Sequence, residues 1–298
     1  MESDRGANDP ADDPADDRAD DRAGNEQMER WNGPTGNAWV EAQDMLDALF
    51  APLEELLVDA FSAGQGGRVL DVGCGTGGTT VAVARRLGPG GRCVGVDISE
   101  PMLEAARARA ERAGVRASFI RADAQDHDFE PGAFDAVVSR FGVMFFPDPV
   151  RAFGNLRRAA REDAVLRFIV WRGLAENPFM TTAERAAAPL MPNLPKRVPD
   201  APGQFALADA DRVRRLLEES GWAGVGIRPV DAACVMPETE LAPYFSRFGP
   251  VGIALRETDA TTRARVVESV RGAFEPFVHD AQVRFTAACW QIDARAAG

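Results

Sequence analysis

The sequence contains few residues of the types that most often bind metals or act as general bases. It has two histidines, four cysteines and one tyrosine among 298 residues. The cysteines form no C-x-x-C pair, and the two histidines lie far apart in the chain. Neither a zinc site nor a disulfide framework is therefore predicted, and we expect no metal and four reduced, mostly buried thiols.

The sequence also lacks a long hydrophobic run and an excess of basic residues. No apolar segment reaches the ~18 residues that a membrane span needs, and the N-terminus does not resemble a secretory signal. The formal net charge is −12, whereas binding to a nucleic-acid backbone depends on Lys and Arg. We therefore expect a cytoplasmic protein that binds neither a membrane nor nucleic acid.

The first 66 residues divide into two parts. Residues 1–24 hold nine acids and a short Asp-rich repeat, so we predict a disordered acidic tail. Residues 25–66 are predicted to form an N-terminal helical cap, because apolar residues recur at spacings of three and four from Trp39 onward. Pro52 is expected to divide this region into two helices. Trp31 and Trp39 are candidates to cover a ligand, with core packing as the alternative.

From residue 67 onward, short apolar segments rich in β-branched residues alternate with helical ones. This pattern predicts an α/β core over residues 67–298, with a parallel sheet covered by helices on both faces. Ser99 is expected to cap the helix that follows the second strand. Two insertions, at about 172–208 and 237–280, are predicted as helical lids over the ligand crevice, with satellite core as the alternative.

The stretch "VLDVGCGTGGTT" contains the pattern G-x-G-x-x-G of dinucleotide-binding loops. Asp97 follows the second strand, where an acid accepts hydrogen bonds from ribose, so NAD and other ribose-bearing cofactors both fit. Asp71 disfavours a pyrophosphate but suits the ammonium of S-adenosylmethionine. The loop amides near Gly75 suit the methionine carboxylate.

Four segments in this order, "VLDVGCGTG", "VGVDIS", "IRADAQD" and "FDAVVSRFGVMFF", resemble the motifs of class I S-adenosylmethionine-dependent methyltransferases. The resemblance implies a Rossmann-like, doubly wound, seven-stranded and mostly parallel sheet with an antiparallel last strand. It also implies S-adenosyl-L-methionine as cofactor and S-adenosyl-L-homocysteine as product. The cofactor-binding residues expected are Trp39, Asp71, Gly73, Gly75, Asp97, Ile98, Met102, Asp123, Ala124 and Ser139.

Within this family the segment "FGVMFFPDP" resembles small-molecule enzymes, including those of quinone and polyketide biosynthesis. The Pro-Pro-aromatic turn typical of nucleic-acid amino methylation does not follow Ser139. The expected function is methyl transfer to a small, partly apolar metabolite. The alternatives are non-methyl chemistry such as cyclisation, a cofactor-sensing binding module and an NAD-dependent oxidoreductase.

The acceptor side is predicted less directly. His279 and Tyr244 are the candidate general bases, each with a surface or structural role as the alternative. Residues near the ends of the fourth and fifth strands are expected to bind the acceptor; they are Phe141, Met144, Phe145, Trp171, Arg172, Asn177 and Phe179. In this interpretation Arg172 and Asn177 orient polar groups of the acceptor. The alternative is that they only cap the turn after the fifth strand. The sequence leaves formation of a homo-oligomer open.

Overall fold

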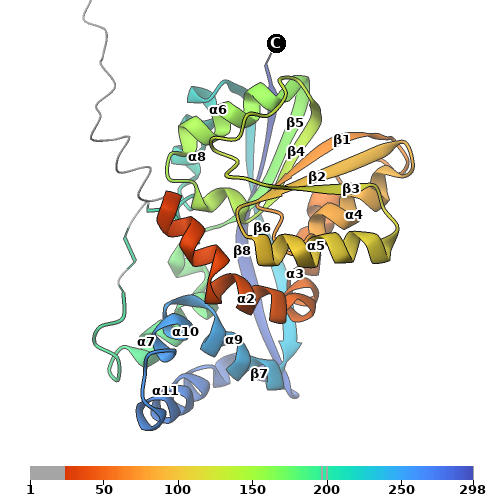
Figure 1. Cartoon of the computed structure of the whole chain (residues 1–298). Helices are drawn as coiled ribbons and strands as arrows, with labels where there is room; N and C mark the ends of the chain where they lie inside the picture. Colours follow the sequence, from red (N-terminus) through yellow and green to blue (C-terminus); the bar gives the residue numbers. More distant parts are fainter. Residues whose placement is uncertain (1–23, 196, 199–200, 298) are drawn as a thin grey trace, which may run out of the picture.

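The computed structural model describes residues 24–195, 197–198 and 201–297. It has an α/β lobe built on a large sheet and a smaller helical lobe below it, as Figure 1 shows. The predicted acidic tail, apart from Gly24, lies outside the described residues.

The sheet is doubly wound and mostly parallel, as predicted. Its strands are β1 (Gly67–Val72), β2 (Gly91–Asp97), β3 (Ala117–Arg121), β4 (Phe134–Arg140), β5 (Ala160–Trp171), β6 (Trp222–Pro237), β7 (Val278–His279) and β8 (Gln282–Ala296). The order is β3-β2-β1-β4-β5-β8-β6, and β8 runs antiparallel to both of its neighbours. The two-residue β7 pairs with β8 in addition to the seven predicted strands.

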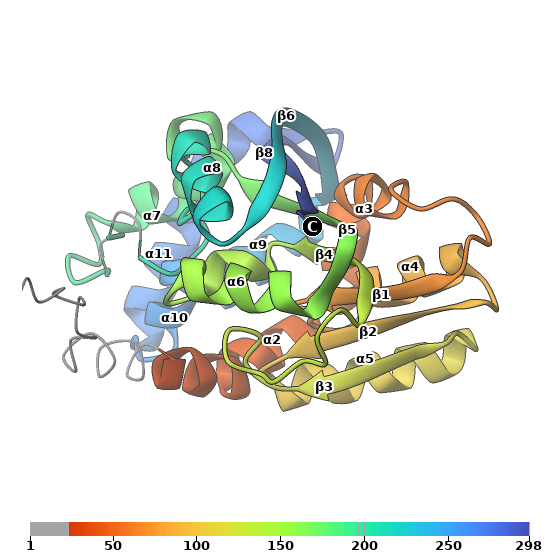
Figure 2. The ribbon, with the colours of Figure 1, turned by 90° about the horizontal axis from the view of Figure 1, so that it is seen from above.

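Helices cover both faces of this sheet. A helical segment spans residues 24–32, and the others are α2 (Pro34–Glu41), α3 (Gln43–Val58), α4 (Gly78–Leu87), α5 (Glu100–Ala113), α6 (Pro149–Ala159), α7 (Pro178–Ala187), α8 (Ala210–Glu219), α9 (Leu241–Arg247), α10 (Gly249–Leu255) and α11 (Ala260–Ala273). Helices α4 and α5 pack against β1–β3, whereas α6 and α8 pack against β5 and β6 (Figure 2). The chain reverses its winding between β1 and β4, where doubly wound proteins form their ligand crevice.

One local prediction was wrong, and another was right in position but not in its hydrogen bond. Pro52 lies inside the continuous helix α3, and the break falls at Ala42, between α2 and α3. The buried face of α3, which includes Leu49 and Leu53, offsets the hydrogen bond that the proline removes. Ser99 stands at the N-cap of α5, but its side chain makes no cap bond. Its hydroxyl donates instead to the carbonyl of Trp31, at 2.6 Å.

The two predicted insertions assemble into one lobe. Helix α7 comes from the first insertion, and α9, α10 and α11 come from the second; all four pack together. The long strands β6 and β8 extend from the α/β lobe into this helical lobe (Figure 1). Its core is aromatic, with the rings of Phe179 and Phe285 stacked 3.8 Å apart. The role of these insertions as lids stays a prediction.

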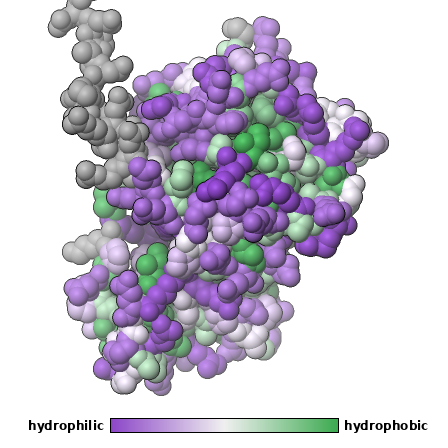
Figure 3. All heavy atoms as spheres, in the orientation of Figure 1, coloured by the Kyte–Doolittle hydropathy of each residue, from purple (hydrophilic) through white to green (hydrophobic). Residues whose placement is uncertain are grey.

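The exterior and the thiols agree with the composition. The face shown in Figure 3 is mostly hydrophilic, with hydrophobic residues in small groups. No helix in the described part of the chain is long and apolar enough to cross a membrane. All four cysteines are buried and free, as expected.

Candidate cofactor and acceptor site

A cavity lies beyond the C-terminal ends of β1, β2 and β4. Its volume is about 140 Å³, well above the roughly 10–15 Å³ that one water molecule needs, so it can take an organic ligand rather than a single solvent molecule. Its lining is Gln27, Trp31, Trp39, Val72, Gly73, Gly75, Val96, Asp97, Ile98, Met102, Ala122, Asp123, Ala124, Arg140, Phe141, Gly142, Phe145, Phe146 and Pro147.

The glycine loop after β1 forms the floor of the cavity. Gly73 has φ +65°, and a Cβ at this position would lie 2.5 Å from the Cα of Gly142. The amides of Gly73 and Cys74 both donate to the carbonyl of Val96, which fixes the loop to β2. Only glycine combines the left-handed backbone with this close approach, so the loop exposes backbone rather than side chains to the cavity.

Asp97, at the end of β2, is held in a single orientation. Its Oδ2 accepts from the Gly75 amide at 2.8 Å, and its Oδ1 accepts from the Ser99 amide at 2.9 Å. Burial raises the pKa of this carboxyl, although the two amide hydrogen bonds act in the opposite direction. Each oxygen keeps capacity for a further donor, as recognition of a ribose diol requires.

Asp71 lies behind the cavity wall rather than in it. Its side chain is buried, and its Oδ2 accepts from the hydroxyl of Thr80 on α4 at 2.6 Å. Burial raises the pKa of Asp71 to about 7, and the Thr80 hydrogen bond opposes this shift. The neighbouring residues Val72 and Gly73 line the cavity, so any effect of Asp71 on a ligand passes through this layer.

One end of the cavity is suited to a planar base. Ile98 and Met102 lie on its wall, and the loop between β3 and β4 contributes Asp123 and Ala124. Partial burial raises the pKa of Asp123, whose Oδ1 accepts from the Gln125 amide. The loop is held in place by a hydrogen bond at 3.0 Å from the side-chain amide of Asn155 on α6 to the carbonyl of Ala124.

Another part of the cavity wall is aromatic. Trp31 contacts Phe145 edge-on, with ring centroids 5.1 Å apart, and Trp39 completes this wall. Phe141 has φ +70°, an unfavourable conformation for a bulky residue, and its ring stacks on Trp171 at 4.8 Å. Strained backbone of this kind persists where surrounding structure fixes a side chain at a functional site.

Several predicted site residues support the cavity without lining it. Ser139 is buried; its hydroxyl donates to the Val72 carbonyl and accepts from the Gly142 amide, which joins β4 to the glycine loop. Met144 is buried and does not line the cavity, and Trp171 lies behind Phe141. These positions are one layer away because successive residues of a strand or a tight turn face in different directions.

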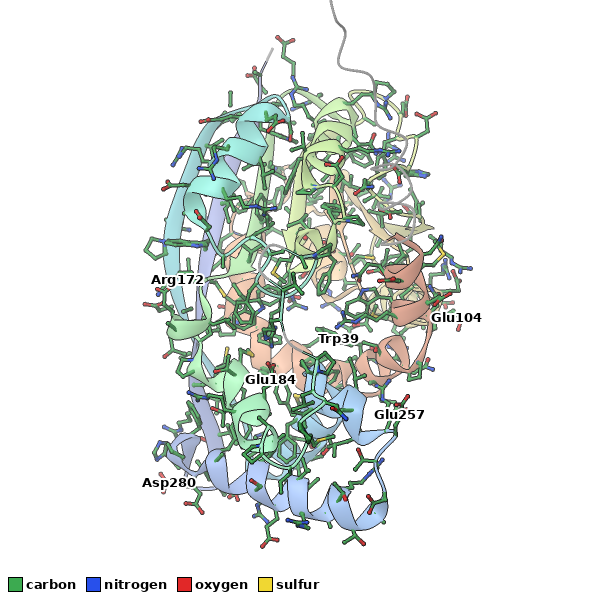
Figure 4. All side chains as sticks on the ribbon, turned by 90° about the vertical axis from the view of Figure 1, so that its left-hand side faces the viewer. Trp39, Glu104, Arg172, Glu184, Glu257 and Asp280 are labelled. Atoms are coloured by element: carbon green, nitrogen blue, oxygen red, sulfur yellow. The ribbon has the colours of Figure 1, made fainter. Side chains whose placement is uncertain are left out.

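Three other predicted acceptor residues lie away from the cavity. Arg172 forms ion pairs with Glu176 and Asp231, and Figure 4 shows it at some distance from Trp39. The side chain of Asn177 bonds both the amide and the carbonyl of Ala288, so it anchors a turn to β8. Phe179 belongs to the aromatic core of the helical lobe; no described residue after Pro147 lines the cavity.

The two candidate bases are also remote from the cavity. His279 is exposed in β7, and its neighbour Asp280 lies at the far end of the helical lobe in Figure 4. Tyr244 donates its hydroxyl to the sulfur of Met180, and burial raises its pKa further above the usual range. The structure therefore does not support either residue as a base for chemistry in this cavity.

The N-terminal segment contributes more residues to the cavity lining than Trp39, the one that was predicted to bind the cofactor. Gln27 and Trp31 also line the cavity. The side chain of Asn32 donates to the Ile98 carbonyl and accepts from the Glu100 amide, both at 3.0 Å, and so ties this segment to the loop after β2. Sequence reasoning missed Gln27 and Asn32, since nothing in their surroundings distinguishes them from surface amides.

Arg140 is another residue that sequence reasoning missed. It is the only basic residue among those lining the cavity in the described chain. An available signal was its position as a charged residue directly after the apolar strand segment "FDAVVS".

Together, the sheet order, the glycine loop and Asp97 define a Rossmann-like α/β protein with a nucleotide-cofactor pocket.

Known proteins with similar sequences narrow this class. Residues 69–163 match a family described as a methyltransferase domain. The chain is 37% identical over 115 residues to nocamycin O-methyltransferase of Saccharothrix syringae; the match covers 38% of this chain and 41% of that protein. It is 43% identical over 91 residues to demethylmenaquinone methyltransferase of Thermus thermophilus, over 30% of this chain and 41% of that one. The chain thus spans less than half the length of these curated relatives.

Solved structures agree on the fold. A putative methyltransferase from Bacillus halodurans superposes with a TM-score of 0.55 at 16% identity, covering 82% of this chain and 99% of that one. The cyclase SpnF superposes with a TM-score of 0.50 at 19% identity, covering 83% and 80%. Residues 69–163 therefore form a methyltransferase domain, and in this segment the chain is similar to S-adenosylmethionine-dependent methyltransferases of class I.

Proposed function

We propose that the protein transfers a methyl group from S-adenosylmethionine to a small, partly apolar molecule. The observation that carries this proposal is one continuous cavity in which a glycine loop and Asp97 adjoin an aromatic wall. When bound, S-adenosylmethionine supplies an electrophilic methyl group on a sulfonium. The polar part of the lining suits the cofactor, and the aromatic part suits an apolar acceptor.

The cofactor half of the proposal rests on the fit of these residues. Asp97 has acceptor capacity left for ribose hydroxyls, and Asp123 lies where it can accept from an adenine amino group, between the apolar walls of Ile98 and Met102. The exposed backbone of the loop near Gly75 lets the amino-acid end approach closely.

The surroundings of α4 favour an amino-acid zwitterion over a pyrophosphate. A Cβ at Gly78, the first residue of α4, would lie 3.0 Å from a carboxylate oxygen of Asp47 and 3.1 Å from one of Glu54. The guanidinium of Arg109 lies 3.1 Å from the same position, and Arg140 pairs with both acids, so the formal charges around this helix start cancel. Neutral surroundings match an amino-acid zwitterion, which has no net charge, better than a pyrophosphate, which carries two negative charges. This observation argues against the NAD-dependent alternative.

The acceptor must supply a good nucleophile of its own. The lining described above includes no histidine, tyrosine, lysine or cysteine, and Asp97 and Asp123 are its only acids. Orientation of two reactants can lower a transfer barrier by about 7–11 kcal/mol without a base. An amine, a phenolate or an enolate meets this requirement, and an apolar ring beside the nucleophile fits the wall formed by Trp31, Trp39 and Phe145. A natural-product or quinone precursor has these properties.

The test is a turnover assay with S-adenosylmethionine and a panel of amines, phenols and enolisable ketones. We expect a methylated acceptor together with an equal amount of S-adenosylhomocysteine. Formation of cofactor fragments without an acceptor would favour non-methyl chemistry such as cyclisation. Tight cofactor binding without any turnover across the panel would favour a cofactor-sensing module.

A further inference from the structure

Four charged side chains meet beside the glycine loop. Arg140, at the end of β4, lies 3.8 Å from Asp47 and 3.7 Å from Glu54, both on α3. Arg109 of α5 contacts the other oxygen of Asp47 at 2.5 Å. We call these four residues the charged cluster. Its formal charges cancel, so it can receive a zwitterion without a net electrostatic penalty.

Arg140 is the member of the charged cluster that reaches the cavity. Its side chain is 16% exposed, and it alone of the four lines the cavity. Its Nη1 is buried and has no hydrogen-bond partner within the part of the chain that the structure describes. The two ion pairs are too long to serve as hydrogen bonds. A buried donor left in this state costs about 1–3 kcal/mol, so the two acids leave the guanidinium incompletely satisfied, and the part of it that lines the cavity is available to a ligand oxygen.

The position of Arg140 identifies which part of a ligand it faces. Ser139, the preceding residue, is bonded to Val72 of β1, and Gly142 packs directly on Gly73. Arg140 is therefore next to the glycine loop rather than to the base-binding end of the cavity. The nearby start of α4 also favours a negative charge at this point.

We propose that Arg140 binds the carboxylate of the methionine moiety of S-adenosylmethionine, and that Asp47 and Glu54 hold the guanidinium in position. This inference rests on the proposed function. It assigns the amino-acid end of the cofactor to a residue from β4 together with two acids from α3. In consequence, the N-terminal cap completes the cofactor site and does not only cover it.

Two ligands that differ in the amino-acid end separate this contact from the rest of the site. S-adenosylhomocysteine carries the carboxylate, whereas 5′-methylthioadenosine keeps the adenosine and the thioether but lacks the amino acid. Calorimetric titration of Arg140→Gln should show binding of S-adenosylhomocysteine weakened by about 10- to 100-fold, as for loss of a charged hydrogen bond. Binding of 5′-methylthioadenosine should stay within about threefold of wild type.

Arg109→Gln is the matched control, because it removes the same charge from the charged cluster without touching the cavity. It should leave the ratio of the two affinities unchanged. Arg140→Lys keeps the charge but loses the planar fork, and should fall between wild type and Arg140→Gln. This second variant carries the test if Arg140→Gln does not fold.

Two results would overturn the inference: unchanged S-adenosylhomocysteine affinity in the Arg140 variants, or equal weakening of both ligands. Failure of the wild-type protein to bind S-adenosylhomocysteine would instead overturn the proposed function, so the two failures are distinguishable.

Discussion

Asp71 makes the stability of the ligand-free protein depend on pH in an unusual direction. Its carboxyl is buried behind the glycine loop, and burial raises its pKa to about 7 from 3.8. The folded state therefore holds the proton more tightly than the unfolded state does. The stabilisation is fully present below about pH 4 and is lost as the pH rises through the folded value near 7.

The size of this effect follows from the pKa difference. A shift of about three units corresponds to about 4 kcal/mol, the cost of keeping the ionised carboxylate buried above pH 7. Asp71→Asn has nearly the same shape, can still accept from the Thr80 hydroxyl, and does not ionise. Between pH 5 and pH 8 the variant should thus gain about 3 kcal/mol relative to wild type.

The measurement is urea denaturation of both proteins at several pH values between 5 and 8, without cofactor. Comparison of the two proteins cancels the other titrating groups. Thr80→Val is a useful second variant, since it removes the hydrogen bond that favours the charged form and should steepen the pH dependence. Parallel curves for wild type and Asp71→Asn would refute the reasoning.

Two further predictions concern the loop and the N-terminal segment. Gly73→Ala should lower the free energy of unfolding by several kcal/mol in urea denaturation, because the added Cβ would meet Gly142. Gly114 is the control: it also has a positive φ, +62°, but nothing lies within 4 Å of an added Cβ, so Gly114→Ala should cost only about 1–2 kcal/mol. Equal costs for the two variants would contradict the close approach of Gly73 to Gly142. Asn32→Ala removes two hydrogen bonds to the loop after β2, worth about 1–2 kcal/mol in all, and should speed amide hydrogen exchange in residues 24–41, measured by mass spectrometry. Unchanged exchange would show that Asn32 does not tie down the segment.

The sheet was predictable because its signals are local. Strands β1, β2 and β4 are short and mostly apolar, and glycines such as Gly88 and Gly114 end the helices between the strands. The ends of parallel strands meet at one edge, so Asp97 and Asp123 were expected near one ligand without knowledge of the packing. Both line the cavity, although their roles toward a cofactor stay predictions.

The acceptor side was less predictable because it depends on packing between distant segments. Phe141 and Phe145 line the cavity, but Phe179, equally aromatic, is buried in the helical lobe. The residue type alone does not show whether a phenylalanine lines the cavity or lies in the core of the helical lobe. Arg140 was not predicted as a site residue. Its importance depends on the two acids of α3, which lie more than eighty residues earlier in the chain.

The central claim is that the cavity binds S-adenosylmethionine through Asp97. It is tested most directly by calorimetric titration of wild type and of folded Asp97→Ala with S-adenosylhomocysteine, with NAD as a second ligand. We predict one-to-one binding of S-adenosylhomocysteine to wild type, no binding of NAD, and affinity about 10- to 100-fold weaker in the variant, from the loss of about 1–3 kcal/mol of hydrogen bonding. Binding of NAD in its place, or equal affinity of the two proteins for S-adenosylhomocysteine, would contradict the account.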